Sequence, residues 1–324
     1  MRLLGSILLL AVATFALSPA EKIPPDDAIR IHEFYRLASQ IQDEIWPKWS
    51  QVPTPLLLVT PDQEFLTNHP SPPKEFKEAG NGFYARPRRF QTSLLATFPA
   101  LGPPSVIVIG EPKNTASKTS TPWLITLMHE HFHQLQNAQP GYFQMVEELG
   151  LSRGDTTGMW MLNYPFPYEK PDTAQAFAKL RDLLLNAVNE PDKNKFEILA
   201  KQYVQARKAF FAQMSSDDRK YLGFQLWQEG IARYTQIKAA EAALQYQPTA
   251  DYMALSDFEP FSAYAAKART ETLNELKQAN LIEWKRTAFY SFGAAEGLLL
   301  DRFNPKWKDG YFKHALSMDS FFEN

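Results

Sequence analysis

The residues best suited to chemistry stand in one run, His129-Glu130-His131-Phe132-His133. On a helix, residues four apart lie on one face, so His129 and His133 can bind one metal ion together. Glu130 lies one step round, where its carboxylate can reach water activated by the metal without occupying the coordination sphere. This arrangement predicts a hydrolytic metal site with Glu130 as general base. A polar helix face with incidental histidines is the alternative interpretation.

His131 belongs to the same run but is placed differently. It lies about 200° round the helix from His129, so it cannot bind the same ion from the same helix. We expect it to be a core histidine or one that supports the site indirectly. The chain contains no cysteine, which excludes disulfide bonds and thiolate metal ligands. Zinc, the metal expected here, would therefore need histidine, glutamate or aspartate ligands.

A catalytic zinc ion usually has three protein ligands, and the third must come from elsewhere in the chain. Gln136 and Gln139 stand where a metzincin has glycine and histidine. Ser152 and Arg153 stand where a thermolysin-like enzyme has its nearby glutamate. These two short spacings are therefore not met, and the third ligand is expected further along the chain.

Glu229 is the preferred third ligand. On a helix expected to begin at Ser216, it continues an apolar stripe formed by Leu222 and Leu226. A carboxylate on an apolar stripe is costly unless it is paired or binds a metal. An ion pair between Glu229 and Arg233, four residues further on, is the alternative.

Three other carboxylates stay open as the third ligand. Glu147 and Glu148 are closer in sequence, but adjacent carboxylates at a helix end are more often solvated. Glu296 is followed by glycine inside an apolar helix, and it can be a ligand, support a histidine, or pair with Arg302. Glu229 is also followed by glycine, and Gly230 would let another backbone or the metal helix approach closely.

Two short motifs in the middle third of the chain form a pattern, namely His129-Glu130-x-x-His133 and, far downstream, Trp227-x-Glu229-Gly230-x-Ala232-x-Tyr234. Together they resemble the motifs of the peptidase MA-like gluzincins. The resemblance implies a zinc-dependent peptidase with His129, His133 and Glu229 as ligands, Glu130 as catalytic base, and a peptide or protein as substrate. The long gap between the motifs, which two helices are expected to fill, departs from the family pattern.

Peptide hydrolysis also needs a hydrogen-bond donor opposite the metal, for the oxyanion of the tetrahedral intermediate. Tyr290 is the preferred donor, because it opens a turn expected to lead into the helix of Glu296. Arg233 can stabilise Glu229 or a substrate. His314 is a lone histidine in an aromatic tail. For each of these residues a purely structural role is equally open.

Hydrophobic periodicity predicts an α+β fold, mostly α and zincin-like, with a small N-terminal sheet region packed on the metal helix. A helix is expected over residues 26–49, and the metal helix over 121–137, with Thr121 as its cap. Strands are expected at 55–60, 89–98 and 105–110, the last well covered on both faces. Further helices are expected at 142–150, 172–188, 193–213, 216–246, 259–279 and 284–302. We expect a single domain over residues 21–324, with its sheet-containing part at about 21–140 and its helical part at about 141–324.

Residues 1–20 have the pattern of an export signal: Arg2, an apolar stretch from Leu3 to Leu17, and a cleavage site after Ala20. The apolar stretch falls short of the roughly 20 residues that span a bilayer, although an uncleaved anchor is the alternative. We therefore expect a secreted or periplasmic protein without stable membrane insertion. The formal net charge of -2 gives no sign of the excess positive charge that is typical of nucleic-acid-binding proteins, so no nucleic-acid partner is expected.

The leading hypothesis is an exported zinc metallopeptidase. The alternatives are a non-peptidic zinc hydrolase that uses the same ligands, and a catalytically silent zincin-like module that binds a partner. An intact Glu130 argues against the silent module, because a purely structural metal site needs no general base. The sequence leaves cleavage specificity and oligomeric state open.

Overall fold

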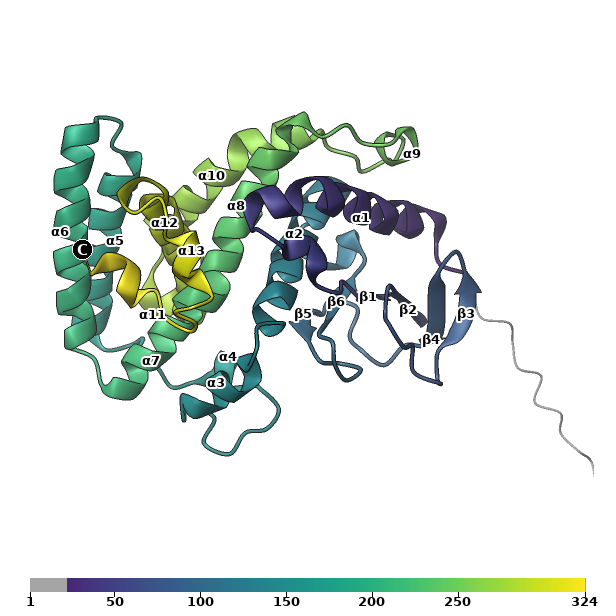
Figure 1. Ribbon diagram of the computed structural model, residues 1–324, viewed down its shortest axis with the longest axis horizontal. Coiled ribbons are helices and arrows are strands. Elements are labelled where there is room, and N and C mark those ends of the chain that lie inside the picture. Colours follow the sequence, from purple (N-terminus) through teal and green to yellow (C-terminus); the bar gives the residue numbers. More distant parts are fainter. Residues whose placement is uncertain (1–21, 324) are drawn as a thin grey trace, which may run out of the picture.

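The computed structural model describes residues 22–323, which form an α+β structure with one six-stranded sheet and mostly helices otherwise (Figure 1). The predicted fold class is confirmed at this level. The predicted signal peptide, residues 1–20, lies outside the described residues. Within residues 22–323, no helix combines the length and the apolar character needed to cross a membrane.

The sheet is mixed, with the strand order β3-β4-β2-β1-β6-β5. β1 and β6 run parallel, and all other neighbouring strands run antiparallel. The strands are β1 (Leu56–Val59), β2 (Gln63–Thr67), β3 (Lys77–Gly80), β4 (Phe83–Pro87), β5 (Leu95–Phe98) and β6 (Val106–Gly110). The first and last of these were predicted, whereas β2, β3 and β4 were not.

The strand predicted over residues 89–98 is confirmed only in its last part, β5. A buried carboxylate explains the difference, because Glu64 on β2 accepts hydrogen bonds from the backbone N–H groups of Arg89, at 2.7 Å, and Phe90, at 2.5 Å. The side chain of Arg86 also donates to Glu64, at 2.7 Å. The backbone at residues 89 and 90 therefore binds a side chain instead of a neighbouring strand.

Two hydrophobic clusters cover the two faces of the sheet. Val106 and Val108 of β6 face the smaller cluster, while Ile107 and Ile109 face the larger one, which continues through the helices. All of β6 is buried, so the prediction that this strand is covered on both faces is confirmed.

The helices predicted after residue 140 are confirmed to within a few residues of their ends. The helices of the structure are α1 (Pro25–Ile45), α2 (Ser120–Asn137), α3 (Tyr142–Glu148), α4 (Trp160–Asn163), α5 (Pro171–Asn189), α6 (Lys193–Ala212), α7 (Ser216–Gln225), α8 (Ile231–Ala242), α9 (Ala250–Met253), α10 (Phe261–Gln278), α11 (Leu281–Trp284), α12 (Ala288–Phe303) and α13 (Lys308–Tyr311). A π-helical turn, Leu226–Gly230, joins α7 to α8.

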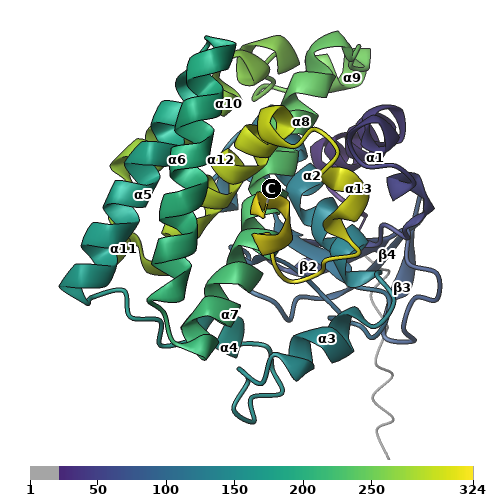
Figure 2. The same cartoon turned by 60° about the vertical axis from the view of Figure 1, so that its left-hand side comes forward.

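The metal helix α2 lies between the sheet and the C-terminal helices, where it packs on β5 and β6, on α1 and on α8 (Figure 2). It begins at Ser120, with Thr119 at the cap position, so the prediction of Thr121 as cap is wrong by two residues. The Thr121 hydroxyl instead donates to the carbonyl of Glu259 at 2.5 Å. Pro122 lies in the first turn, where a missing N–H removes no helical hydrogen bond.

Two glycines let α12 approach the α7–α8 helix closely. A Cβ added at Gly230 would lie 2.6 Å from the Cα of Gly293, and one added at Gly293 would lie 2.5 Å from the Cα of Gly230. Backbone therefore touches backbone here, as the sequence predicted for Gly230, but the partner is α12 and not the metal helix. This contact brings the start of α12 beside the π-helical turn.

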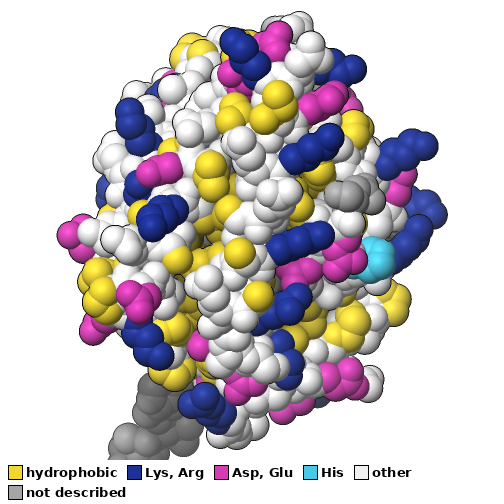
Figure 3. Space-filling model, turned by 90° about the vertical axis from the view of Figure 1, so that its left-hand side faces the viewer, with side chains coloured by type: hydrophobic (Ala, Val, Ile, Leu, Met, Phe, Trp, Pro, Cys, Tyr) yellow, Lys and Arg dark blue, Asp and Glu magenta, His cyan; other side chains and the backbone are white. Residues whose placement is uncertain are grey.

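The outer surface carries no large region of a single charge on the side where α5 and α6 lie. Figure 3 shows lysine and arginine scattered among aspartate, glutamate and apolar side chains over this face. The mixture agrees with the small formal net charge of the whole chain.

Candidate metal centre

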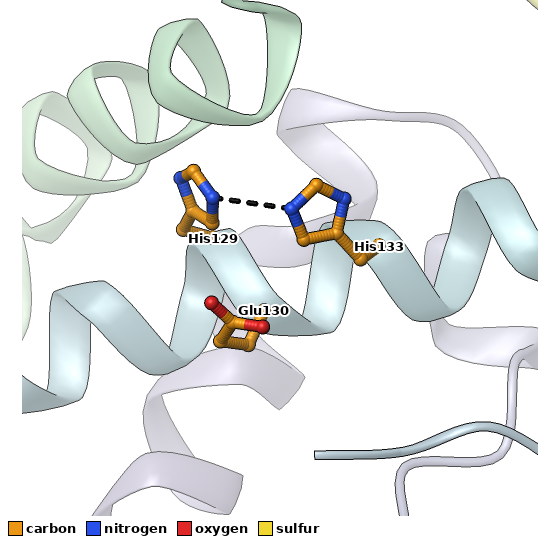
Figure 4. Close-up of side chains that lie close together, drawn as sticks. All are labelled: His129, Glu130 and His133. Atoms are coloured by element: carbon orange, nitrogen blue, oxygen red, sulfur yellow. Dashed lines mark hydrogen bonds between the residues drawn. The ribbon is translucent and has the colours of Figure 1, made fainter. Parts of the chain in front are cut away.

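His129 and His133 lie side by side on one face of α2, as the spacing of four predicts (Figure 4). Their Nε2 atoms are 3.2 Å apart, and both side chains are buried. Glu130 emerges one step round the helix. These three residues each offer a possible ligand atom, and the atoms all lie within 4.8 Å of one another. The group could hold a metal ion.

Glu229 comes to the same place from the opposite side. Its Oε2 atom lies 3.3 Å from Nε2 of His133 and 3.7 Å from Nε2 of His129. Glu229 belongs to the π-helical turn, which inserts an extra residue into the helix and so changes the direction of the side chains after it. The structure thus brings together the three residues that the sequence suggested as ligands.

The same turn separates Glu229 from Arg233. Arg233 bonds to Glu275 of α10 at 2.8 Å, so the pair between Glu229 and Arg233, the alternative role for Glu229, is not formed. That alternative assumed 3.6 residues per turn, and the π-helical turn shifts the two side chains out of line. The cation beside Glu229 is Arg286 instead, with Nη1 3.4 Å from Oε1.

The spacing of these atoms fits a tetrahedral ion. Bonds of about 2.0–2.2 Å to nitrogen and oxygen at tetrahedral angles place neighbouring donor atoms about 3.4 Å apart. The three separations measured here are 3.2, 3.3 and 3.7 Å. Glu130 also lies within 4.8 Å of the histidine nitrogens, but Glu229 is the closer carboxylate. Glu130 is held instead by Thr97, whose hydroxyl donates to Oε2 at 2.7 Å.

Gln136 fixes the orientation of the His133 ring. Nδ1 of His133 lies 2.7 Å from Oε1 of Gln136, whose Nε2 donates to the backbone carbonyls of Trp227 and Gln228, both at 3.1 Å. Because the amide nitrogen is already donating, Oε1 must accept a hydrogen bond from the Nδ1–H group of His133. The lone pair of neutral His133 is then on Nε2, the atom that faces His129 and Glu229.

The charges at the site are coupled. Burial lowers the pKa of His133, but the charge and hydrogen bond of Glu229 outweigh this and raise it to about 9. Burial lowers the pKa of His129. Burial would raise the pKa of Glu229, but the two histidines hold it well below its usual range. Without a metal, one proton on His133 therefore occupies the position that a cation would take.

Tyr290 lies beside this group but not in the turn that the sequence suggested, because it already belongs to the first turn of α12. Its ring is parallel to that of His129, with centroids 6.3 Å apart. The Nη1 group of Arg286 donates to its hydroxyl at 2.8 Å. Burial, and then the charge of Glu229, raises the pKa of Tyr290, so the hydroxyl stays protonated and can act as a donor.

The rival carboxylates lie elsewhere. Glu147 and Glu148 are exposed on α3, where they accept hydrogen bonds from Ser152 and Gln144, respectively. Glu296 is fully buried and bonds to Arg207 at 2.6 Å.

The structure also shows the partners of Arg302 and His131. Arg302 does not pair with Glu296, since it donates to the carbonyl of Glu190. His131 is a core histidine, as expected: it stacks on Trp49, bonds through Nδ1 to Gln134 at 2.9 Å, and has its pKa lowered to about 4 by burial.

The sequence analysis missed three residues that contact the site: Thr97, Gln136 and Arg286. Gln136 follows His133 by three residues on one helix, and this spacing was a usable signal. Thr97 and Arg286 come from β5 and from the segment before α12, so only the tertiary structure reveals them. The chain matches no protein-family model, no curated protein and no solved structure.

Proposed function

We propose that the protein is a zinc-dependent hydrolase that cleaves peptide bonds. The observation that carries this proposal is the convergence of two imidazole nitrogens and one carboxylate oxygen, separated by 3.2–3.7 Å, next to the buried carboxylate of Glu130. Three donors leave one position of a tetrahedral ion open, which is typical of catalytic sites and not of structural ones.

His129, His133 and Glu229 would hold the ion. Two neutral imidazoles and one carboxylate suit zinc, and the absence of cysteine limits the donors to these types. When bound, zinc would lower the pKa of water to about 7 and polarise a carbonyl group.

Glu130 is placed to move the proton. Thr97 holds its Oε2 atom, which leaves Oε1 able to accept a proton from the attacking water. The water oxygen then bonds to the carbonyl carbon, the C–N bond breaks, and Glu130 returns the proton to the departing nitrogen. The products are a carboxylic acid and an amine.

The sheet supports a peptide as the substrate. The strand just before α2, β6, lies between β1 and β5, and β5 is the edge of the sheet next to it. The hydroxyl of Thr97 on β5 donates to Glu130. Among the described strands β5 pairs with β6 alone, so its other side can bind an extended peptide by main-chain hydrogen bonds. Such a peptide would pass the proposed base.

The Tyr290 hydroxyl would donate to the oxyanion, since it stays protonated and stands beside His129. Arg286 holds this hydroxyl in place through the bond from Nη1. The signal-like residues 1–20 further lead us to propose that the enzyme acts outside the cytoplasm.

Glu130→Gln tests the proposal. The variant keeps an acceptor for Thr97 but loses the basic carboxylate, so we expect one zinc ion per chain to be retained while peptide turnover falls by about 10²–10⁴-fold. Glu147→Gln, an exposed carboxylate on the nearby α3, is the control and should keep full turnover. Normal turnover in Glu130→Gln would refute the role of Glu130.

A further inference from the structure

Arg286 stands between the candidate metal centre and a cavity of about 630 Å³. All of its hydrogen bonds to the described part of the chain leave from Nη1, which reaches Tyr290, Glu229 and Gln225. Its side chain is 18% exposed. Nε and Nη2 make no hydrogen bond to the described residues, so this residue of the cavity lining keeps donors available.

The ion pair between Arg286 and Glu229 is long, so the guanidinium can still bind another anion. Nη1 and Oε1 are 3.4 Å apart, longer than the usual charge-assisted hydrogen bond. Glu229 is also shared with His129 and His133. A metal held by that carboxylate would take more of its charge, so Arg286 would be left with a charge that no partner fully balances.

The cavity itself favours an anion. Its lining carries three cations, Lys170, Lys285 and Arg286, and one anion, Glu169. Glu169 lies 3.4 Å from Lys285, and both side chains are largely exposed. Aromatic side chains, among them Phe166, complete the lining. An arginine with a free edge recognises a carboxylate through two parallel hydrogen bonds.

The carboxylate of Glu229 lies between Arg286 and the histidines of the candidate metal centre, with Oε2 3.3 Å from Nε2 of His133 and Oε1 3.4 Å from Nη1 of Arg286. One residue of an extended peptide spans up to about 3.6 Å, and a hydrogen bond from the guanidinium adds about 2.9 Å to this reach. A substrate with its scissile carbonyl at the metal centre can therefore place a carboxylate of the neighbouring residue against Arg286.

We propose that Arg286 and this cavity bind a carboxylate carried by the residue that follows the cleaved bond. The proposal rests on the function proposed above and names its substrate class: peptides with an anionic group one residue from the point of cleavage. Two sources supply that group, the α-carboxylate at the C-terminus of a peptide and the side chain of aspartate or glutamate.

The test uses the zinc-loaded protein and N-acylated dipeptides that carry each common amino acid at the first position. The second residue is phenylalanine with a free carboxylate or as its amide, or aspartate amide against asparagine amide. We expect kcat/KM to be roughly 10- to 100-fold higher for the carboxylate member of one pair. The phenylalanine pair identifies the α-carboxylate as the source, and the aspartate pair identifies the side chain.

Arg286→Gln separates recognition from a purely structural role. Loss of recognition should bring the carboxylate-to-amide ratio to within about threefold of one, whereas a disturbed site would lower both rates and keep the ratio. Arg233→Gln is the matched control, because Arg233 bonds to Glu275 away from the site and should leave the ratio unchanged. A ratio that Arg286→Gln leaves intact overturns the proposal.

Binding to zinc-loaded Glu130→Gln, measured by calorimetry with the same compounds, separates this proposal from the peptidase assignment. A carboxylate preference that requires Arg286, without cleavage by the native protein, supports carboxylate binding at Arg286 and refutes the peptidase assignment. Cleavage without a carboxylate preference supports the peptidase assignment and refutes carboxylate binding at Arg286. If the compounds are neither bound nor cleaved, both proposals are overturned.

Discussion

Acidification should weaken zinc binding steeply in this protein, because a proton on His133 competes with the metal. The pKa of that residue is raised to about 9 by Glu229, against the burial that would lower it. A raised pKa means that the metal-free site holds its proton at neutral pH, so each bound ion must displace it. Affinity should therefore rise with pH up to about 9.

The size of the effect follows from the competition. With a pKa of about 9, the fraction of sites free of the proton grows about 30-fold between pH 6.0 and 7.5, and the apparent association constant should grow equally. The same proton stabilises the metal-free fold: the stabilisation is complete below pH 6.5 and is lost as the pH rises through 9. The free energy of unfolding of the metal-free protein should then decrease by up to about 3 kcal/mol.

Competition with a chelating indicator measures the affinity across this pH range, and calorimetry in buffers of different ionisation enthalpy counts the protons released. In Glu229→Gln the largest upward influence on the pKa of His133 is gone, while Glu130 and Gln136 still raise it against burial, so that pKa should fall well below its native value. Zinc should then bind more weakly, and its affinity should rise less steeply from pH 6.0 to 7.5 than in the native protein. A flat profile in the native protein, or an equally steep one in Glu229→Gln, would refute the reasoning.

The remaining predictions concern packing, ring orientation and the oxyanion. Gly230→Ala should lower the free energy of unfolding by about 1–3 kcal/mol in chemical denaturation, because its Cβ would meet α12 at 2.6 Å; Gly223→Ala, with its nearest neighbour at 3.6 Å, should be neutral or stabilising. Gln136→Leu should weaken zinc binding about 10- to 100-fold, because it frees the His133 ring, whereas Gln139→Leu, two residues after the end of α2, should leave it unchanged. Equal affinities of the two variants would contradict this. Tyr290→Phe should lower kcat about 10²–10³-fold with zinc content unchanged, and an unchanged kcat would exclude the hydroxyl as donor.

Local periodicity predicted the elements that depend on apolar spacing. The long helices and the buried strands β1 and β6 have strong apolar patterns, so their positions could be predicted, whereas short helices such as α4, α9 and α13 were not predicted. The strands β3 and β4 could not, since they contain charged and small residues such as Lys77 and Arg86, and they form through pairing with β2. Polar side chains in such strands are explained by tertiary partners that the local sequence does not show.

The site was predictable where its residues share one helix or one short motif. His129, Glu130 and His133 follow from helical spacing, and Glu229 from its position on an apolar stripe. The alternative ion pair between Glu229 and Arg233 is not formed, because the π-helical turn changes the register. Arg286 replaces it from a distant segment, and no spacing rule connects the two segments.

Crystals of the zinc-loaded protein, measured at the zinc absorption edge, would show whether His129, His133 and Glu229 bind the metal. We expect one anomalous peak, about 2.0–2.2 Å from Nε2 of His129, Nε2 of His133 and one carboxylate oxygen of Glu229, with Glu130 outside bonding distance. A peak at other residues, or no peak between the two imidazoles in protein saturated with zinc, would contradict it.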